Sequence, residues 1–276
     1  MKKHKRTLFS YLMLFLLILY IPLSFAAPIK SLWDIWQPYN ANSTKVINHQ
    51  LYQNFLTKYV STNAQGLNLV HYSAVTPQDK AELERYLSQM SVVSIAEYNR
   101  NEQLAYWINV YNALTIETIL NHYPVQSIRD IKLGGFFSDG PWDAKLLTID
   151  HIPVSLNDME HRIIRPIWND PRTHYALNCA SYSCPNLQKT AYTGASVNRM
   201  LTSDAKAYIN SPRGVDIKNN QLIISSIYDW YQIDFGSNDQ AVITHLEQYA
   251  DPALAKQLKS FNMIAGYQYN WQLNGN

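Results

Sequence analysis

The segment from His174 to Pro185 carries the residue types most able to do chemistry in this chain. An imidazole at His174 is followed by two thiols, Cys179 and Cys184, which are separated by Ala-Ser-Tyr-Ser. A thiol reacts as its thiolate, so it needs a base or another group that lowers its pKa. The sequence therefore predicts a thiol nucleophile at Cys179 or Cys184, with His174 as its base.

The spacing of these residues sets a geometric condition on the pair. The segment from His174 to Cys179 is mostly apolar and predicts a buried strand that leads into a polar turn. Residues five apart on a straight strand face opposite sides of the sheet. Either a bulge re-aims one of the two side chains, or the turn folds Cys184 back. Ser183 is an alternative nucleophile, although the chain has no Gly-x-Ser-x-Gly elbow of the lipase type.

The same two cysteines also suit a purely structural role. They lie about 16–17 Å apart if the intervening chain is extended, which is too far for a disulfide. A turn at residues 181–183 closes that gap, and a bridge in so short a loop stabilises a fold by roughly 2 kcal/mol. The alternative to a reactive thiol is thus a local disulfide between Cys179 and Cys184.

Three further residues, Glu160, Asn109 and His161, are candidates for the site. Glu160 or Asn109 is expected to orient His174, as the third member of a catalytic triad does. Glu160, His161 and His174 also offer ligand types that bind zinc, but their spacing follows no known zinc pattern. We expect neither a metal nor a cofactor.

Asn109 belongs to the strongest predicted helix, over residues 102–122, which Pro124 ends. This helix is apolar on nearly every side, which is typical of a buried central helix. Asn109 and Asn112 are three residues apart and therefore share a face. A buried amide without hydrogen bonds costs about 1–3 kcal/mol. The two amides are expected either to tie the helix to neighbouring backbone or to line the site.

The loop from Gly134 to Trp142 is rich in glycine and aromatic residues. It lacks the form of a nucleotide-binding loop, which follows a strand and opens a helix. Phe137 and Trp142 are expected to line a groove for a peptide-like or glycan ligand, with Asn112 and Ser183 as further binding residues. The alternative is that these aromatic side chains pack over the central helix.

The rest of the chain must position these groups, and its pattern predicts a single α+β domain. Helices come first and antiparallel hairpins come later, which argues against a doubly wound α/β fold. Asn157 has Glu160 three residues later, which is the signature of a helix N-cap. Further helices are expected at residues 46–60, 77–90, 195–209, 227–233 and 239–250, hairpins at 145–154 and 215–224, and a closing strand at 267–273.

The first 26 residues predict a removable signal peptide. Four of the 23 basic residues lie in the first six positions, an apolar run follows from Leu8 to Ile21, and small residues stand at Ser24 and Ala26. Cleavage after Ala26 would give a periplasmic or secreted protein, and the alternative is an uncleaved anchor. We expect a lead-in over residues 27–45, one domain over 46–273, and membrane contact through the signal segment alone.

Four stretches of the chain together resemble one known family. They are YWINVYNALT at 106–115, YPVQSI at 123–128, DMEHRIIRP at 158–166 and HYALNCASYSCP at 174–185. Their content and order resemble the domain of unknown function 547 family, and the likeness extends from about Val46 to Leu273. The resemblance implies no particular activity, because the family is named for having none assigned.

A weaker resemblance concerns the layout of the elements. An apolar helix followed by a histidine-bearing segment is similar to the transglutaminase and papain-like arrangement, in which a cysteine begins the helix. In this chain the comparable position lies near Asn109 and holds no cysteine. The resemblance therefore implies a related layout without the ordinary papain-type nucleophile.

These observations lead to two expectations about function. One is a thiol-dependent hydrolase or acyl transferase that acts on peptide-like substrates. The other is a non-catalytic periplasmic binding or scaffold module, with a structural disulfide and a small peptide-like or glycan ligand. Without its first six residues the chain has 19 basic and 21 acidic residues, so it offers no electrostatic footprint for nucleic acid.

Overall fold

Helix α4 (Arg100–His122) runs through the middle of the larger hydrophobic core. Its residues are buried almost without interruption from Glu102 to Ile119, because other elements cover it on every side. Asn99 caps its start by accepting a hydrogen bond from the backbone N–H of Glu102, at 3.0 Å. The computed structural model describes residues 28–133 and 139–275, and within them it confirms the predicted central helix.

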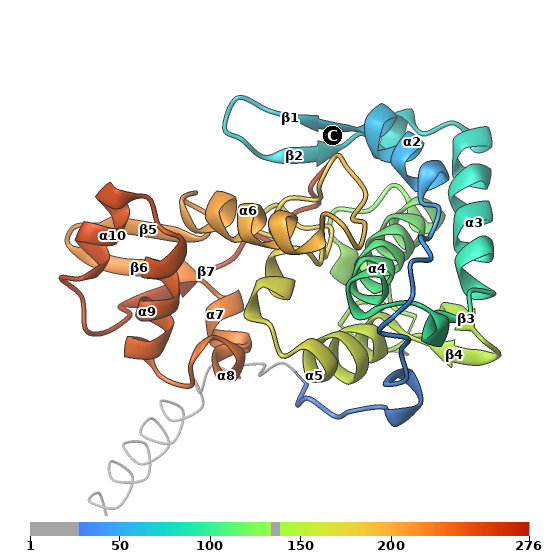
Figure 1. Cartoon of the computed structure of the whole chain (residues 1–276). Helices are drawn as coiled ribbons and strands as arrows, with labels where there is room; N and C mark the ends of the chain where they lie inside the picture. The colour runs from blue at the N-terminus through green and yellow to red at the C-terminus, as the bar shows by residue number, and fades with distance from the viewer. Residues whose placement is uncertain (1–27, 134–138, 276) are drawn as a thin grey trace, which may run out of the picture.

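The elements around α4 form the right-hand part of the molecule in Figure 1. Helix α3 begins as its sequence predicts, since the hydroxyl of Thr76 accepts from the N–H of Asp79 and Pro77 takes the first helical position. The elements around α4 are α2 (Gln50–Tyr59), α3 (Pro77–Ser91), hairpin β1 (Val60–Thr62) and β2 (Asn68–Val70), hairpin β3 (Leu147–Ile149) and β4 (Ile152–Val154), and α5 (Arg165–Trp168).

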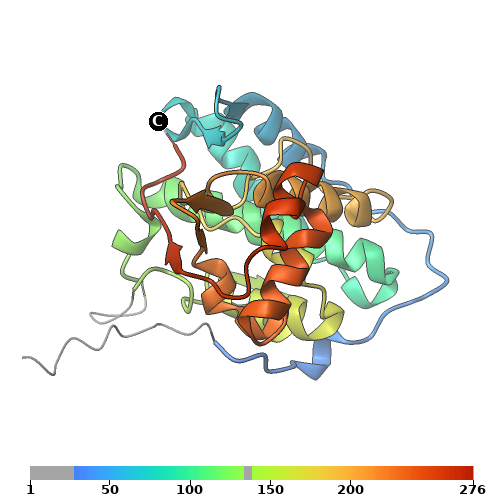
Figure 2. The same ribbon diagram turned by 90° about the vertical axis from the view of Figure 1, so that its left-hand side faces the viewer.

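A smaller core lies on the other side of helix α6 (Val197–Ile209), which packs against α4 as well. Figure 1 shows its sheet and helices at the left, and Figure 2 shows the last two helices from the front. Its elements are β5 (Val215–Lys218), β6 (Gln221–Ser225), α7 (Ile227–Trp230), α8 (Gln232–Phe235), α9 (Asp239–Tyr249), α10 (Pro252–Leu258) and β7 (Gly266–Gln268).

The strands form small separate sheets. Strands β5 and β6 are antiparallel, and β7 joins β6 in parallel. Asn219 and Asn220 connect β5 to β6 with φ angles of 50° and 58°, the left-handed pair that a two-residue hairpin turn requires. Asp150 and His151 play the same part between β3 and β4. Helices with small, largely antiparallel sheets confirm the predicted α+β class.

The C-terminal segment fastens the two cores together. After β7 the chain returns to the larger core, where Leu273 bridges Ser181 and Gly275 bridges Val70. Asn274 donates its backbone N–H to the carbonyl of Ala180, and its own carbonyl accepts from Val70. The predicted closing strand is therefore real only at its start, and the rest of it is a set of single bridges.

The predicted strand from His174 to Cys179 is wrong. Residues Pro171–Tyr175 form the short 3₁₀ helix η6, which Asp170 caps by accepting from the N–H of Arg172 at 2.9 Å. After it, the side chain of Asn112 hydrogen-bonds the carbonyl of Ala176 and the N–H of Asn178. Because a side chain satisfies this backbone, no neighbouring strand is needed.

Three smaller expectations also need correction. Asn157 does not cap a helix; Ser155 and Asp158 bond one another's backbone N–H groups and open the wide π-type helix η5 (Asp158–Ile164). The helix expected from residue 46 begins at Gln50. The helix expected at 227–233 is divided at Tyr231 into α7 and α8. The proposed signal peptide lies outside the described residues, among which no helix combines the length and apolarity of a membrane span.

The buried carboxyl of Asp204 on α6 makes the stability of the fold depend on pH. Its side chain is 5% exposed and accepts a hydrogen bond from the hydroxyl of Tyr192 at 2.6 Å. Burial raises the pKa of Asp204 to about 7, and the bond from Tyr192 only partly opposes this. The unfolded chain loses this proton near pH 4 and the folded protein near pH 7. Stability contributed by the neutral carboxyl is therefore lost as pH rises through that window.

We expect Asp204→Asn to be more stable than the wild type at pH 8, by on the order of 1–4 kcal/mol, because the amide never carries the buried charge. Near pH 4 the two proteins should be almost equally stable. Urea unfolding at pH 4, 6 and 8 measures the difference. The control is Asp251→Asn, on an exposed residue, and a pH-independent difference for Asp204→Asn would contradict the assignment.

Candidate active site

The turn that carries both cysteines is held by buried amides. Asn112 on α4 fixes the chain on entry, with hydrogen bonds of 2.9 Å to Ala176 and 2.8 Å from Asn178. Asn178 then bonds the carbonyl of Pro185 at 3.0 Å and the N–H of Ala180 at 2.9 Å. Ala180 has a φ of 57°, which reverses the chain directly after Cys179. Hydrogen bonds from the side chains of Asn112 and Asn178 thus fix both ends of the turn.

This turn brings the two cysteines together. The backbone N–H of Cys179 donates to the sulfur of Cys184 at 2.9 Å, and the Cys184 thiol also reaches the carbonyl of Leu177 at 3.6 Å. Cys179 is partly exposed, whereas Cys184 is buried. Both are free thiols, so the expected disulfide is not present in this structure. The turn folds Cys184 back toward Cys179, and not toward His174 as expected.

The Cys179 sulfur lies among hydrogen-bonding groups that favour a thiolate. Its Sγ is 3.0 Å from the hydroxyl of Tyr269 and 3.2 Å from that of Ser181, and these two hydroxyls are 2.8 Å apart. Hydrogen bonding from the Cys184 thiol is the largest influence lowering the pKa of Cys179; against burial, this bond and those from Ser181 and Tyr269 bring it to about 7. The thiolate is therefore well populated at neutral pH.

Cys184 has the opposite tendency. Burial raises its pKa well above the ordinary value, and its contact with Cys179 raises it further. When one of two touching thiols ionises, the charge makes ionisation of the second harder. The pair therefore favours ionisation of Cys179 over ionisation of Cys184.

Ser183 has a structural role in the same turn. Its hydroxyl accepts from the backbone N–H of Asn270 at 2.8 Å, and its own N–H donates to the Asn270 carbonyl at 3.1 Å. Its carbonyl accepts from the hydroxyl of Tyr208 at 2.7 Å. Ser183 thereby ties the turn to the segment after β7, which is the segment that delivers Tyr269. Its hydroxyl is occupied, which speaks against the alternative nucleophile.

Aromatic rings form a wall beside the Cys179 thiol. Trp271 lies 4.7 Å from Tyr269, 5.4 Å from Trp230 and 5.8 Å from Trp142, measured between ring centroids. All four are only partly buried. Trp142, expected from sequence as a binding residue, is thus part of a surface that reaches the thiol through Tyr269. Phe137 lies outside the described residues.

His174 belongs to a different, more deeply buried cluster. Its Nε2 is 2.8 Å from Oδ2 of Asp234, and its Nδ1 is 3.7 Å from Oε1 of Glu160. The ring packs on Tyr231 with centroids 4.2 Å apart, and the side chain is only 3% exposed. Among the hydrogen bonds of the described residues, none joins His174 to either cysteine. The geometry thus brings Glu160 to His174 as expected, but separates both from direct contact with the thiols.

Asp234 is the centre of this charged cluster. It accepts from His174 and from Nε of Arg165 at 2.6 Å, and Lys30 lies 2.9 Å from its other oxygen. Burial alone would raise the pKa of Asp234, but the bonds from His174 and Arg165 outweigh it and hold that pKa well below its usual range. The carboxylate is therefore ionised at all pH values at which the protein is expected to be folded.

Two tyrosines connect the charged cluster to the thiols. Tyr111 donates to Glu160 at 3.3 Å, and Tyr231 also bonds Glu160. Burial raises the pKa of both tyrosines, and so do the negative charges of Glu160 and Cys179, which places each hydroxyl within electrostatic reach of both groups. The connection between the two clusters is therefore electrostatic and indirect.

The remaining predicted residues have local tasks. Both polar atoms of the Asn109 amide bond the backbone of Tyr192, at 2.8 and 3.0 Å, so Asn109 anchors a loop and reaches neither cluster. His161 bonds Arg165 at 2.8 Å, and burial lowers its pKa. In the part of the chain that the structure describes, no group of three His, Cys, Asp or Glu side chains is arranged to hold a metal ion.

Sequence reasoning missed several residues that matter most here, namely Ser181, Asp234, Arg165, Tyr231 and Tyr269. Asp234 is 60 positions from His174, and Tyr269 is 90 positions from Cys179. Neither lies in a motif or at a spacing that links it to its partner. Ser181 and Arg165 had a usable signal, because they lie in the motifs at 174–185 and 158–166.

We expect Asp234→Asn to destabilise the fold by about 3–5 kcal/mol, because it leaves the buried guanidinium of Arg165 without its counter-charge. The control is Asp139→Asn, which removes the exposed partner of Arg129 and should cost less than about 1 kcal/mol. Urea unfolding at pH 7 compares the two. Equal, small losses would show that the cluster does not hold the elements together.

Comparison with known proteins finds one family model that matches part of this site. Residues 95–209 match the model described as protein of unknown function, DUF547. The match takes in α4, Glu160, His174 and both cysteines, but stops before Asp234 and Tyr269, so it is shorter than the likeness expected from the motifs. Searches of curated proteins and of solved structures returned no match, and the transglutaminase or papain-like layout is not confirmed. Over residues 95–209 this chain is similar to the DUF547 family, as its sequence motifs led us to expect.

Proposed function

We propose that this protein is a thiol-dependent enzyme whose nucleophile is Cys179 and whose substrates are peptide-like. The observation that carries the proposal is the environment of one cysteine: Cys179 is partly exposed as a residue, and its Sγ is within hydrogen-bonding distance of Ser181 and Tyr269, in the same turn as a second free thiol. A low pKa and partial exposure are what distinguish a reactive cysteine from an inert buried one.

The reaction best supported by this geometry is thiol–disulfide exchange. The Cys179 thiolate attacks one sulfur of a substrate disulfide, a mixed disulfide forms, and the other substrate sulfur leaves as a thiolate. Cys184 then loses its proton to solvent or to that leaving sulfur and attacks Cys179. The substrate departs fully reduced, and a Cys179–Cys184 disulfide remains. The two electrons gained by the substrate come from the two cysteine thiols.

The contrast between the two thiols fits these roles. The attacking thiol should be exposed and largely ionised, and the second thiol should be shielded until a mixed disulfide forms beside it. Cys179 is the more exposed of the two cysteines and has the lowered pKa, whereas Cys184 is buried and has the raised pKa, and no base touching either sulfur is required. An exported location, as the signal-peptide pattern predicts, would place the pair where disulfides form and persist.

A hydrolase or acyl transferase is the second candidate, and the hydroxyl pair favours it. Cys179 would attack an acyl carbonyl and form a thioester, while Tyr269 or Ser181 donates a proton to the leaving group. Water or a second nucleophile would then release the acyl group. This route uses the neighbouring hydroxyls in place of His174, whose Nε2 is engaged with Asp234. The aromatic wall would bind the peptide-like or glycan part of either kind of substrate.

The alternative without catalysis is a binding module in which the two cysteines form a permanent bridge. In that case the isolated protein would contain no titratable thiol, and mild reductants would not change its ligand binding. Thiol titration of the isolated protein therefore separates this alternative from the catalytic proposal.

We expect alkylation of Cys179 by iodoacetamide to reach half its maximal rate near pH 7. Tyr269→Phe removes one hydrogen bond to the sulfur and should raise that midpoint by roughly half to one pH unit. Cys184→Ala should raise it as well, because the Cys184 thiol is the largest influence lowering the pKa of Cys179. Mass spectrometry of the alkylated peptide gives the rate at each pH.

The matched control is Tyr267→Phe, which makes the same change two residues earlier, at an exposed tyrosine of β7. It should leave the midpoint unchanged. A wild-type midpoint near pH 9, or equal shifts for the two tyrosine variants, would contradict the proposed stabilisation of the thiolate.

Cys184→Ala also separates the two reactions. If exchange is the activity, the variant should accumulate a mixed disulfide with an oxidised peptide and lose multiple-turnover reduction by at least a hundredfold. If acyl transfer or hydrolysis is the activity, the Cys184→Ala variant should keep at least a tenth of the wild-type rate of that reaction, measured at a pH above the variant's alkylation midpoint. Cys179→Ser should abolish both, and full activity in that variant would overturn the nucleophile assignment.

A further inference from the structure

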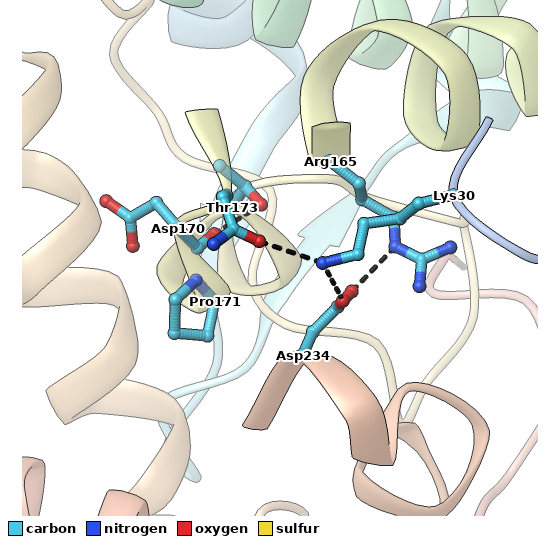
Figure 3. A pocket seen from close by; sticks show the side chains of 7 residues that line it. Lys30, Arg165, Asp170, Pro171, Thr173 and Asp234 are labelled. Carbon is cyan, nitrogen blue, oxygen red and sulfur yellow. Dashed lines mark hydrogen bonds and ion pairs between the residues drawn. The ribbon is translucent and has the colours of Figure 1, made fainter. Parts of the chain in front are cut away.

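A small hollow lies beside Asp234. Its lining residues are Lys30, Arg165, Asn169, Asp170, Pro171, Thr173 and Asp234. Figure 3 shows Lys30 and Arg165 approaching Asp234 from different directions, while the carboxylate of Asp170 points away. The ammonium of Lys30 lies 2.9 Å from Oδ1 of Asp234 and 2.8 Å from the amide oxygen of Asn169. The chain's own lysine thus forms part of the lining, and Asp234 and Asn169 hold its ammonium.

The segment that carries Lys30 is held like a bound peptide. The N–H of Ser31 donates to the carbonyl of His161 at 3.1 Å, and the N–H of Trp33 donates to that of Arg162 at 3.0 Å. Nη1 of Arg165 donates to the carbonyl of Pro28 at 2.7 Å. These bonds use main-chain atoms, which any extended peptide possesses.

The sequence of the helix explains why one of these carbonyls is free. In η5 the hydrogen bonds span five residues, as the bond from the N–H of Arg165 to the carbonyl of Glu160 shows. The next bond of that type would join His161 to residue 166, which is a proline and has no N–H. The carbonyl of His161 therefore needs a donor from outside the helix, and residues 28–33 supply one.

Of the other side chains of this segment, Trp33 packs against the larger core, and Ile29 and Leu32 contribute little packing. Ile29 is 88% exposed and Leu32 is 43% exposed. Trp33 is partly buried under the guanidinium of Arg162, 4.1 Å from its ring centroid. In Figures 1 and 2 the segment follows the outside of the molecule. A segment with few buried apolar contacts opens at low free-energy cost.

We propose that this hollow is a recognition site for the side-chain ammonium of a lysine in an extended peptide, and that residues 28–33 occupy it as an internal ligand which such a peptide displaces. Asp234 and Asn169 recognise the ammonium, and the carbonyls of His161 and Arg162 recognise the peptide backbone. The inference does not depend on Cys179 chemistry.

The chemistry of the hollow favours lysine over arginine. One oxygen of Asp234 is already taken by His174 and Arg165, which leaves the single oxygen Oδ1 for a ligand. A guanidinium binds best when it can contact both carboxylate oxygens, whereas an ammonium is a compact point charge. Asp234 is only 6% exposed, so Oδ1 requires a cation whenever Lys30 leaves.

The test uses the purified chain and a fluorescent hexapeptide with the sequence of residues 28–33, Pro-Ile-Lys-Ser-Leu-Trp. Lys30→Met empties the ammonium position, so we expect it to bind this peptide at least tenfold more tightly than the wild type does. A peptide with norleucine in place of lysine should bind at least tenfold more weakly than the lysine peptide. Lys45→Met, at an exposed ion pair with Glu97, should match the wild type.

Two results would overturn the proposal: equal binding of the lysine and norleucine peptides, or no binding to a folded Lys30→Met chain. Hydrogen exchange in the wild type provides a second measurement that needs no variant. The amides of Ser31 and Trp33 should exchange faster when excess lysine peptide is added, whereas those of α4 should not. Exchange that is unchanged by the peptide would show that residues 28–33 are a fixed part of the fold.

Discussion

The structure depends on buried polar side chains of α4 that hydrogen-bond irregular backbone. Asn109 takes both backbone groups of Tyr192, and Asn112 takes those of Ala176 and Asn178. Glu102 accepts from the N–H groups of Ile47 and Gly194, at 2.7 and 2.8 Å. A buried loop normally leaves backbone groups without partners, which is why loops lie at protein surfaces. Here one helix supplies those partners, so loops far apart in the sequence can pack around it.

This arrangement also determines the reactivity of the cysteine turn. A strand through His174 and Cys179 would pair its N–H groups with a neighbouring strand and leave none for a sulfur. Because Asn112 and Asn178 satisfy the turn instead, the N–H of Cys179 is free to bind Cys184, and Ser181 is free to face Cys179. The pKa of Cys179 is lowered by hydrogen bonds from Cys184, Ser181 and Tyr269, which the turn and the segment after β7 bring to its sulfur, and it does not require a nearby positive charge.

The elements set by local pattern could be predicted, and those set by distant contacts could not. The central helix, the Thr76 cap and the Asn219-Asn220 turn follow from periodicity or from residues next to one another. The apolar run at His174 looks like a strand, but Asp170 and Pro171 start a short helix there and Asn112 replaces the missing strand partner. Asp234 and Tyr269 complete the two clusters from positions with no periodic relation to them, so neither could be found without the fold.

The two clusters place different demands on solvent access, which explains why His174 and Cys179 are close in sequence but do not interact directly. A buried carboxylate such as Asp234 is tolerable only if cations and hydrogen-bond donors surround it, so Arg165, His174 and Lys30 are committed to it. A reactive sulfur also needs donors that stabilise its anion, but in addition it needs a path to solvent. If His174 turned toward Cys179, it would leave Asp234 with one donor fewer in the interior. The same imidazole cannot serve both groups at once, and its 2.8 Å bond shows that Asp234 holds it.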